Sequence, residues 1–173
     1  MKKVDRNMII DRVDDQDRVI GQIRRAEVFK ERANFRVVHI LIYNKKGELL
    51  LQQLSPSRER HPGQWGSSVA GYVFRGEDYR KASRRRLRQE LGIARAPLHL
   101  LGKFSMRDKG CRKFVSVFTT EYDGPLRPDP DHISQIQFVP VATIKQELKR
   151  EEHMDFTPTF SFLFGKVLEQ GER

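Results

Sequence analysis

The chain has 173 residues, of which 33 are basic and 23 acidic, giving a formal net charge of +10. This length suits one domain with its own core, and the basic excess favours anionic partners such as nucleotides, diphosphates or nucleic acid. A single cysteine, Cys111, excludes an intrachain disulfide, and no apolar run reaches the roughly 20 residues that a membrane-spanning helix needs. We see no signal peptide in MKKVDRNMII and expect a cytoplasmic protein without a membrane partner.

The first predicted element is a hairpin, because apolar segments at 9–10 and 19–20 flank the turn cluster 14–17. The polar segment 26–32 favours a short helix, and we group residues 1–34 with the main body, 35–170, in one globule. The main body alternates strands with a few helices, which predicts an α/β domain with a mixed sheet. We expect strands at 37–43, 48–54, 69–74, 98–104, 114–122 and 136–141, and helices at 78–91, 142–152 and 158–169.

The segment 71–93, GYVFRGEDYRKASRRRLRQELGI, carries the chemical signal. It resembles the box of the Nudix hydrolase family: a glycine, five residues, Glu, seven residues, then Arg-Glu-apolar-x-Glu-Glu-x-Gly-apolar. Gly71, Glu77, Arg85, Leu87, Glu90, Gly92 and Ile93 fall on this pattern. Arg86 and Gln89 depart from it, because the family has glutamate at both positions.

The resemblance extends on both sides of the box. The stretch 49–53, the Pro-Gly-x-Trp at 62–65 and the Phe-Thr-Pro at 156–158 are similar to the family's flanking segments. Together with the N-terminal hairpin, they resemble a bacterial Nudix subgroup close to type 1 isopentenyl-diphosphate isomerase. The resemblance implies a Nudix α/β/α sandwich with a mixed sheet, preceded here by the hairpin.

The chemistry of such a box is attack of water on a diphosphate, with Mg²⁺ or Mn²⁺ ions on carboxylate oxygens. The resemblance implies metal ligation and catalysis by Glu90 and Glu77, with a further metal ligand in the backbone carbonyl of Ala70. Arg58 and Arg60, in the loop before the box, are expected to reach the substrate's phosphates together with Arg86. Arg85 is expected to orient neighbouring carboxylates.

The two departures weaken this site. Arginine stays protonated and only donates hydrogen bonds, so Arg86 can be neither a base nor a metal ligand. Glutamine at position 89 keeps one neutral oxygen but loses the charge. Glu90 with the Ala70 carbonyl and the ligand's phosphates would still hold one Mg²⁺. We expect positions 86 and 89 to face solvent, so that restoring both acids would disturb the fold little.

Three functions stay open. The preferred one is a Mg²⁺-dependent hydrolase of a nucleoside diphosphate derivative, of low activity because two acids are replaced. The alternative is an inactive module that binds a nucleotide or RNA through its basic surface, which Arg86, Gln89 and the net charge favour. Isomerase activity is a third, weaker hypothesis, because Ala70, Tyr72 and Phe35 stand where the isomerase has a catalytic cysteine and metal-binding histidines.

Two acids outside the box are further candidates. Asp129 and Asp131 lie where many Nudix proteins carry a late acid on a loop, although aspartate is also an ordinary turn residue. The arginines and lysine along the predicted helix at 78–91 are interpreted as a solvated face. The sequence indicates no oligomeric state.

Overall fold

The computed structural model describes residues 7–150 and 155–171. The predicted hairpin is present: β1 (Ile9–Val13) pairs antiparallel with β2 (Val19–Arg24), and the short 3-10 helix η1 (Arg25–Glu27) follows. Its turn places Asp17 at a φ of 63°, a conformation that aspartate tolerates better than most residues. Residues 1–6 of the predicted N-terminal segment lie outside the described residues.

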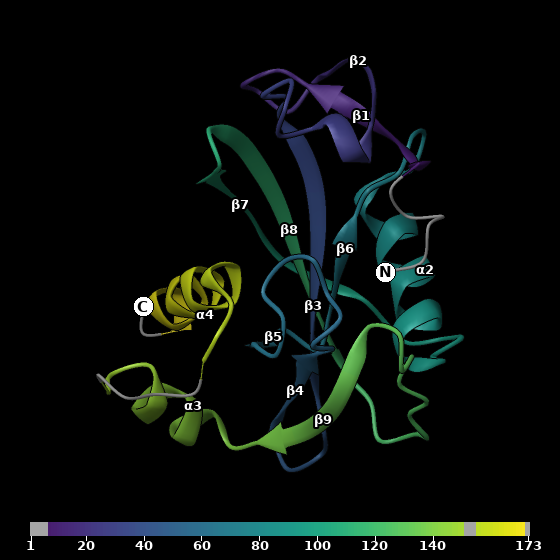
Figure 1. Cartoon of the computed structure of the whole chain (residues 1–173). Coiled ribbons are helices and arrows are strands. Elements are labelled where there is room, and N and C mark those ends of the chain that lie inside the picture. Colours follow the sequence, from purple (N-terminus) through teal and green to yellow (C-terminus); the bar gives the residue numbers. More distant parts are fainter. Residues whose placement is uncertain (1–6, 151–154, 172–173) are drawn as a thin grey trace.

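A seven-stranded sheet forms the centre of the molecule (Figure 1). Five strands run in the order β5-β4-β3-β8-β7, while β6 pairs with β3 and β9 with β4. Because β3 and β8 are parallel and the other pairs antiparallel, the predicted mixed sheet is confirmed. The strands are β3 (Phe35–Tyr43), β4 (Leu49–Leu54), β5 (Trp65–Gly66), β6 (Val69–Tyr72), β7 (His99–Asp108), β8 (Cys111–Glu121) and β9 (Ile133–Val139).

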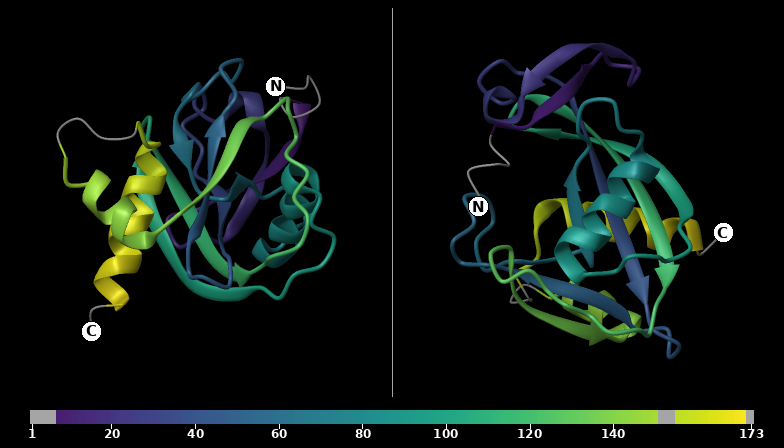
Figure 2. Two further views of the ribbon diagram at one scale, coloured as in Figure 1. Left: turned by 90° about the horizontal axis from the view of Figure 1, so that it is seen from below. Right: turned by 90° about the vertical axis from the view of Figure 1, so that its right-hand side faces the viewer.

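Strand β3 is apolar on both faces because each face is covered. Its even-numbered residues 38, 40 and 42 pack in one apolar cluster with Leu87 and Leu91 of α2 (Tyr79–Leu91). Its odd-numbered residues 35, 37 and 41 pack in a second cluster with Phe160 and Phe164 of α4 (Pro158–Gly171). Figure 2 shows these two helices on opposite sides of the sheet.

The ends of the helices follow local chemistry. Asp78 caps α2 by accepting from the backbone N–H of Lys81 at 2.7 Å, and Gly92 ends it in the left-handed region with a φ of 70°. The third helix, α3 (Val141–Glu147), is shorter than the predicted 142–152. Positions 151–152 of that prediction lie outside the described residues.

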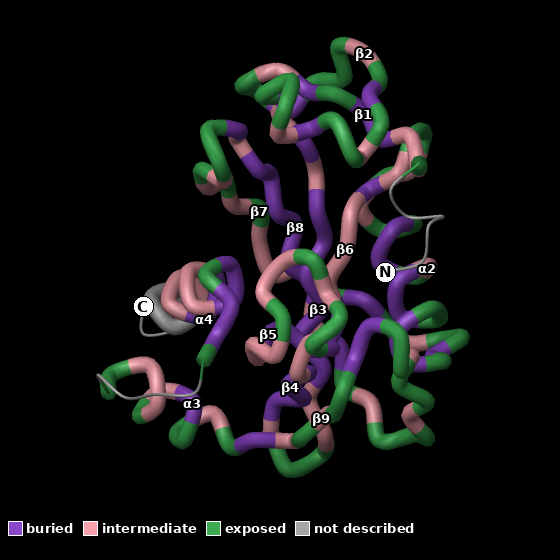
Figure 3. The backbone as a smooth tube through the Cα atoms, viewed as in Figure 1, coloured by how far each residue is buried: buried purple, intermediate pink, exposed green. Residues whose placement is uncertain are grey.

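The hairpin is joined to the main sheet by apolar and polar contacts. Ile10 and Ile23 belong to the same apolar cluster as Phe35, whereas Asp15 and Gln16 at the turn are exposed. Figure 3 shows exposed backbone over much of the hairpin. The buried carboxylate of Asp17 accepts from Arg36 of β3 at 2.6 Å, and it also pairs with Lys103 of β7. In the described part of the chain, no helix is long and apolar enough to cross a membrane.

Candidate functional site

The loop between β6 and α2 is closed by an ion pair. Arg85 donates to both carboxylate oxygens of Glu77, at 2.7 and 2.9 Å, and to the carbonyl of Tyr72 at 2.8 Å. Glu77 also accepts from the backbone N–H of Phe74 at 2.9 Å, and the Arg85 guanidinium lies 3.7 Å from the centroid of the Phe74 ring. Both oxygens of Glu77 are therefore used in holding the loop against the helix.

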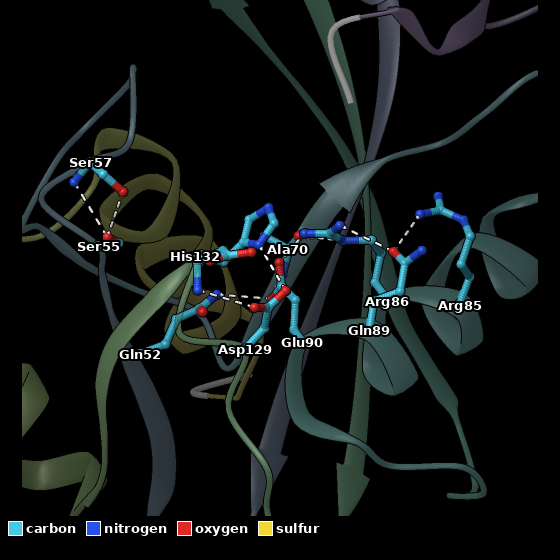
Figure 4. A network of polar contacts seen from close by, with 11 residues as sticks. Gln52, Ser55, Ser57, Ala70, Arg85, Arg86, Gln89, Glu90, Asp129 and His132 are labelled. Atoms are coloured by element: carbon cyan, nitrogen blue, oxygen red, sulfur yellow. Dashed lines mark hydrogen bonds and ion pairs between the residues drawn. The ribbon is translucent and has the colours of Figure 1, made fainter. Parts of the chain in front are cut away.

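Glu90 lies beside Ala70, as the box spacing predicts, but Arg86 lies there too (Figure 4). Glu90 accepts from the Ala70 backbone N–H at 3.4 Å and from the Gln52 side chain at 3.3 Å. Arg86 donates through Nε to the Ala70 carbonyl at 3.1 Å and forms an ion pair with Glu90. The guanidinium thus bridges two groups expected to bind the metal.

The expectation that Arg86 faces solvent is wrong. Its side chain is 8% exposed, and that of Glu90 is 4% exposed. Gln89 is exposed, as expected, and its side-chain oxygen accepts from Arg86 at 3.3 Å and from Arg85 at 3.1 Å. The expectation failed because an arginine can be buried when a carboxylate one turn away forms an ion pair with it.

Gly71 makes room for Arg86. A Cβ atom on this glycine would overlap Nε of Arg86 and lie 2.7 Å from its Cδ. The arginine side chain therefore packs against the backbone of β6 at a position where there is no side chain, and its Nε reaches the Ala70 carbonyl. Arg86 and Gly71 both line a pocket beside β6.

These residues do not fit a divalent ion in this arrangement. The Ala70 carbonyl and both Glu90 oxygens are engaged by hydrogen-bond donors, and a fixed positive charge lies between them. Glu77 is bound by Arg85. Within 7–150 and 155–171, no three His, Cys, Asp or Glu side chains are grouped to hold a metal.

A pocket of about 140 Å³ lies beside β3 and β6, and Arg86 forms part of its lining. Its lining includes five cationic side chains and one acidic side chain, which come from η1, β7, β8, α2 and the loop before β5. Phe35, Tyr72 and Phe74 form an aromatic part of the wall. The charged residues are Arg25, Arg58, Arg60, Arg86, Lys113 and Asp108.

Asp108 organises two of these cations. It accepts a bidentate pair of hydrogen bonds from Arg60, at 2.8 and 3.1 Å, and a third hydrogen bond from Lys113 at 3.0 Å. Burial alone would raise the pKa of Asp108, but Arg60 and Lys113 hold that pKa below its ordinary value. Burial lowers the pKa of Lys113, and Asp108 opposes that effect. One carboxylate therefore holds two cations at the pocket wall.

His39 of β3 also lines the pocket and is neutral at physiological pH. Burial, followed by the nearby charge of Lys113, lowers the pKa of His39 to about 3. Its Nδ1 lies 2.8 Å from the hydroxyl of Ser67. His39 thus offers a polar but uncharged surface to a ligand.

The predicted site residues divide between two places. Arg58, Arg60 and Arg86 meet at the pocket with Ala70 and Gly71, whereas Glu77 and Arg85 close the loop and Gly92 ends the helix. Asp129 donates its backbone N–H to the Glu90 carbonyl at 2.8 Å and pairs with His132. Cys111 is buried, and burial raises the pKa of its thiol. Sequence reasoning missed the pocket residues Arg25, His39, Asp108 and Lys113 and the Glu90 partner Gln52.

Comparisons with known proteins identify the family. The NUDIX domain matches residues 33–160, which is most of the chain. An uncharacterised Nudix hydrolase of Pseudomonas aeruginosa, PA4841, is 37% identical over 140 residues, covering 81% of this chain and 80% of that protein. DR0079 from Deinococcus radiodurans superposes with a TM-score of 0.77 at 26% identity, covering 92% of this chain and 98% of that structure.

A second structure supports the fold alone. The NUDIX domain of NrtR from Shewanella oneidensis, solved in complex with ADP ribose, matches with a TM-score of 0.62 at 16% identity, covering 86% of this chain and 99% of that one. The predicted Nudix fold is confirmed by these structural matches. Because the NUDIX domain covers most of the chain and a Nudix hydrolase is 37% identical to it, the chain belongs to the Nudix hydrolase family.

Proposed function

We propose that the pocket beside β6 binds a small diphosphate-containing molecule of the nucleoside diphosphate class. The observation that carries this proposal is the charge of the lining: five cationic side chains against one carboxylate. Such an excess in a partly enclosed pocket favours an anion of two or more charges. Arginine, which supplies four of the five cations, presents a planar fork that matches phosphate oxygens.

The surroundings of the pocket suit the rest of such a ligand. An adjoining pocket of about 310 Å³ shares Arg25, Arg58, Arg60 and Tyr72 with the first. A diphosphate beside Arg86 would therefore have space for a nucleoside or a second sugar on the far side of the shared arginines. The diphosphate ADP ribose, present in the NrtR structure, provides a suitable probe of this class.

Hydrolysis of the bound diphosphate is the second candidate. Family membership favours it, and so do Glu77 and Glu90, which keep their places in the box pattern. A divalent ion such as Mg²⁺ or Mn²⁺ would supply charge neutralisation and an activated water. Arg86 would first have to leave Glu90 and the Ala70 carbonyl, so we rank hydrolysis below binding. The isomerase is disfavoured, because Phe35 and Tyr72 stack at 5.4 Å where that enzyme has metal ligands.

Calorimetric titration tests the proposal. ADP ribose and ADP should bind the parent with similar affinity, while adenosine, which lacks phosphate, should not bind. Arg60→Gln should weaken ADP ribose binding by about tenfold or more, the usual effect of losing a hydrogen bond to a charged group. Arg84→Gln, an exposed change on α2 outside this pocket, is the matched control. Equal affinity for adenosine and ADP would refute the phosphate site.

The same samples test the second candidate. Release of AMP or inorganic phosphate from ADP ribose and nucleoside diphosphates would be followed with Mg²⁺ and with Mn²⁺. Turnover by the parent at a rate typical of enzymes, above about 1 s⁻¹, would reverse the ranking and make hydrolysis the primary function.

A further inference from the structure

Arg86 stands where the family pattern has an acid. Its guanidinium contacts the Ala70 carbonyl and the Glu90 carboxylate, the groups that the resemblance assigns to a metal ion. Arginine keeps its proton under all ordinary conditions, so this charge is permanent. A cation of the chain itself therefore already contacts the groups that the resemblance assigns to the metal.

The fold is adapted to this placement. Gly71 leaves room for the Arg86 side chain, because a Cβ atom at position 71 would overlap Nε of the guanidinium. Gln89 supports the guanidinium with a neutral oxygen at 3.3 Å, while Gln52 satisfies the second oxygen of Glu90 at 3.3 Å. The result is a buried ion pair whose polar groups are hydrogen-bonded, the condition under which such a pair is tolerated.

Arg86 also retains donors for a ligand. Three of its five N–H groups are used in the contacts to Ala70, Gln89 and Glu90. The side chain nevertheless lines the basic pocket. A phosphate oxygen in that pocket would meet the guanidinium where, in a metal-dependent site, it would meet the ion.

We infer that Arg86 acts as a built-in cation in place of the divalent metal, so that this pocket binds its diphosphate ligand without metal. The inference rests on the proposed function, because it specifies how the same pocket neutralises phosphate charge. It differs from that function in one measurable respect: the metal requirement.

The decisive experiment is calorimetric titration of the parent with ADP ribose, once in EDTA and once with Mg²⁺. We expect the two dissociation constants to agree within about threefold, a difference below 1 kcal/mol. Mn²⁺ binding is followed separately by the loss of the electron paramagnetic resonance signal of free Mn²⁺. We expect the parent to leave that signal unchanged with ADP ribose bound, beyond the weak binding of Mn²⁺ to the ligand alone.

Variants test the role of the side chain. Arg86→Gln should weaken ADP ribose binding in EDTA by about tenfold to a hundredfold, because a charged donor is lost. Arg84→Gln, the exposed change on the same helix, should bind as the parent does. If Arg86→Gln does not fold, the comparison of EDTA with Mg²⁺ in the parent still decides the question.

The outcomes separate the two proposals. Binding that requires Mg²⁺ or Mn²⁺, or stoichiometric Mn²⁺ uptake by the parent, would overturn the inference and leave the proposed function standing. Failure of ADP ribose and ADP to bind with or without metal would overturn the proposed function itself.

Discussion

Arg86 and Glu90 form a buried ion pair one turn apart on α2, and the arginine packs against Gly71 and lines the basic pocket. Breaking a buried pair by removing one partner is costly, because the other charge is left uncompensated. Arg86 therefore contributes both to the stability of the fold, through Glu90, and to the lining of the pocket. Changes that move Arg86 should therefore alter both the free energy of unfolding and the affinity of the pocket for its ligand.

Gly71→Ala should displace Arg86. The added methyl group would overlap Nε and Cδ of the arginine, and overpacking of this kind costs about 1–3 kcal/mol. We expect a lower free energy of unfolding in urea and weaker ADP ribose binding in the same variant. Gly21→Ala is the control, because nothing lies within 4 Å of a Cβ built at Gly21. Unchanged stability and affinity in Gly71→Ala would show that Arg86 can line the pocket in a conformation that avoids the added methyl group.

Asp17 should be important for attaching the hairpin to the sheet. Its buried carboxylate accepts from Arg36 at 2.6 Å and from the Tyr79 hydroxyl at 2.9 Å, and it pairs with Lys103. Asp17→Ala should lower the free energy of unfolding by about 3 kcal/mol, the low end for breaking a buried pair.

Two further variants separate the causes of that loss. Asp17→Asn keeps the left-handed φ of 63° accessible and one hydrogen-bonding oxygen, so it should cost less than Asp17→Ala. Asp15→Ala, an exposed change in the same turn, should stay within about 0.5 kcal/mol of the parent. If Asp17→Ala lowers the free energy of unfolding no more than Asp15→Ala does, the Asp17 contacts are not important for attaching the hairpin to the sheet.

His39 should make stability depend on pH. Its pKa is about 3 in the folded state and about 6.5 when unfolded. Between these values the unfolded chain binds a proton that the folded chain does not, so stability falls as pH is lowered from 6.5 towards 3. The contribution is about 1.4 kcal/mol per pH unit in that window.

Urea denaturation at several pH values between 7 and 4 measures this contribution. In His39→Asn the amide nitrogen can replace Nδ1 opposite Ser67, but the side chain does not titrate. The slope of the free energy of unfolding against pH should therefore be shallower in His39→Asn than in the parent. Equal slopes would show that His39 takes up its proton in the folded state near its ordinary pKa.

Much of the fold could be predicted from local sequence patterns. The turn cluster at 14–17, the two-sided apolar run of β3 and the Asp78 and Gly92 helix ends each carry their own signal, and each appears in the structure. These signals are local because turns, caps and strand periodicity depend on neighbouring residues. Helix α3 was predicted too long, since weakly amphipathic polar residues do not mark where a helix ends.

The pocket could be predicted only in part. The box placed Glu90 beside Ala70, but pattern alone gave no reason to bury Arg86, since arginine is normally exposed unless paired. Asp108 and Lys113 lie on adjoining strands and meet Arg60 from a distant loop. No motif joins these three residues, so their meeting depends on strand register that the sequence does not show.

Salt dependence should distinguish a pocket ligand from nucleic acid. A small anion that contacts two or three cations should bind more weakly as salt rises, but only moderately. A single-stranded RNA that contacts six phosphates would lose affinity with a log–log slope of about −4. We expect ADP ribose to show the shallower dependence and an RNA oligonucleotide to bind weakly at physiological salt. Tight RNA binding with a steep slope would favour the exposed basic helix as the partner surface.

The last prediction is that a metal-dependent site can be restored. Arg86→Glu together with Gln89→Glu removes one positive charge and adds two negative charges beside Glu90. Because Arg86 is buried, this variant should be destabilised in EDTA, contrary to the small fold damage expected from sequence. Mg²⁺ or Mn²⁺ should raise its melting temperature, since the ion replaces the lost guanidinium and binds only the folded state.

The same double variant should gain hydrolysis. With a metal held by three carboxylates, one of them can act on water, and a general base contributes about 10²–10⁴-fold. Cleavage of ADP ribose and nucleoside diphosphates would be compared with the parent at equal metal concentration. Glu90→Gln in this background should abolish both the metal-induced stabilisation and the cleavage. If the parent is already as fast as the double variant, the base lies elsewhere, with Asp129 and Asp131 the next residues to change. If the double variant folds, binds metal and cleaves nothing, the chain is better described as a binding module.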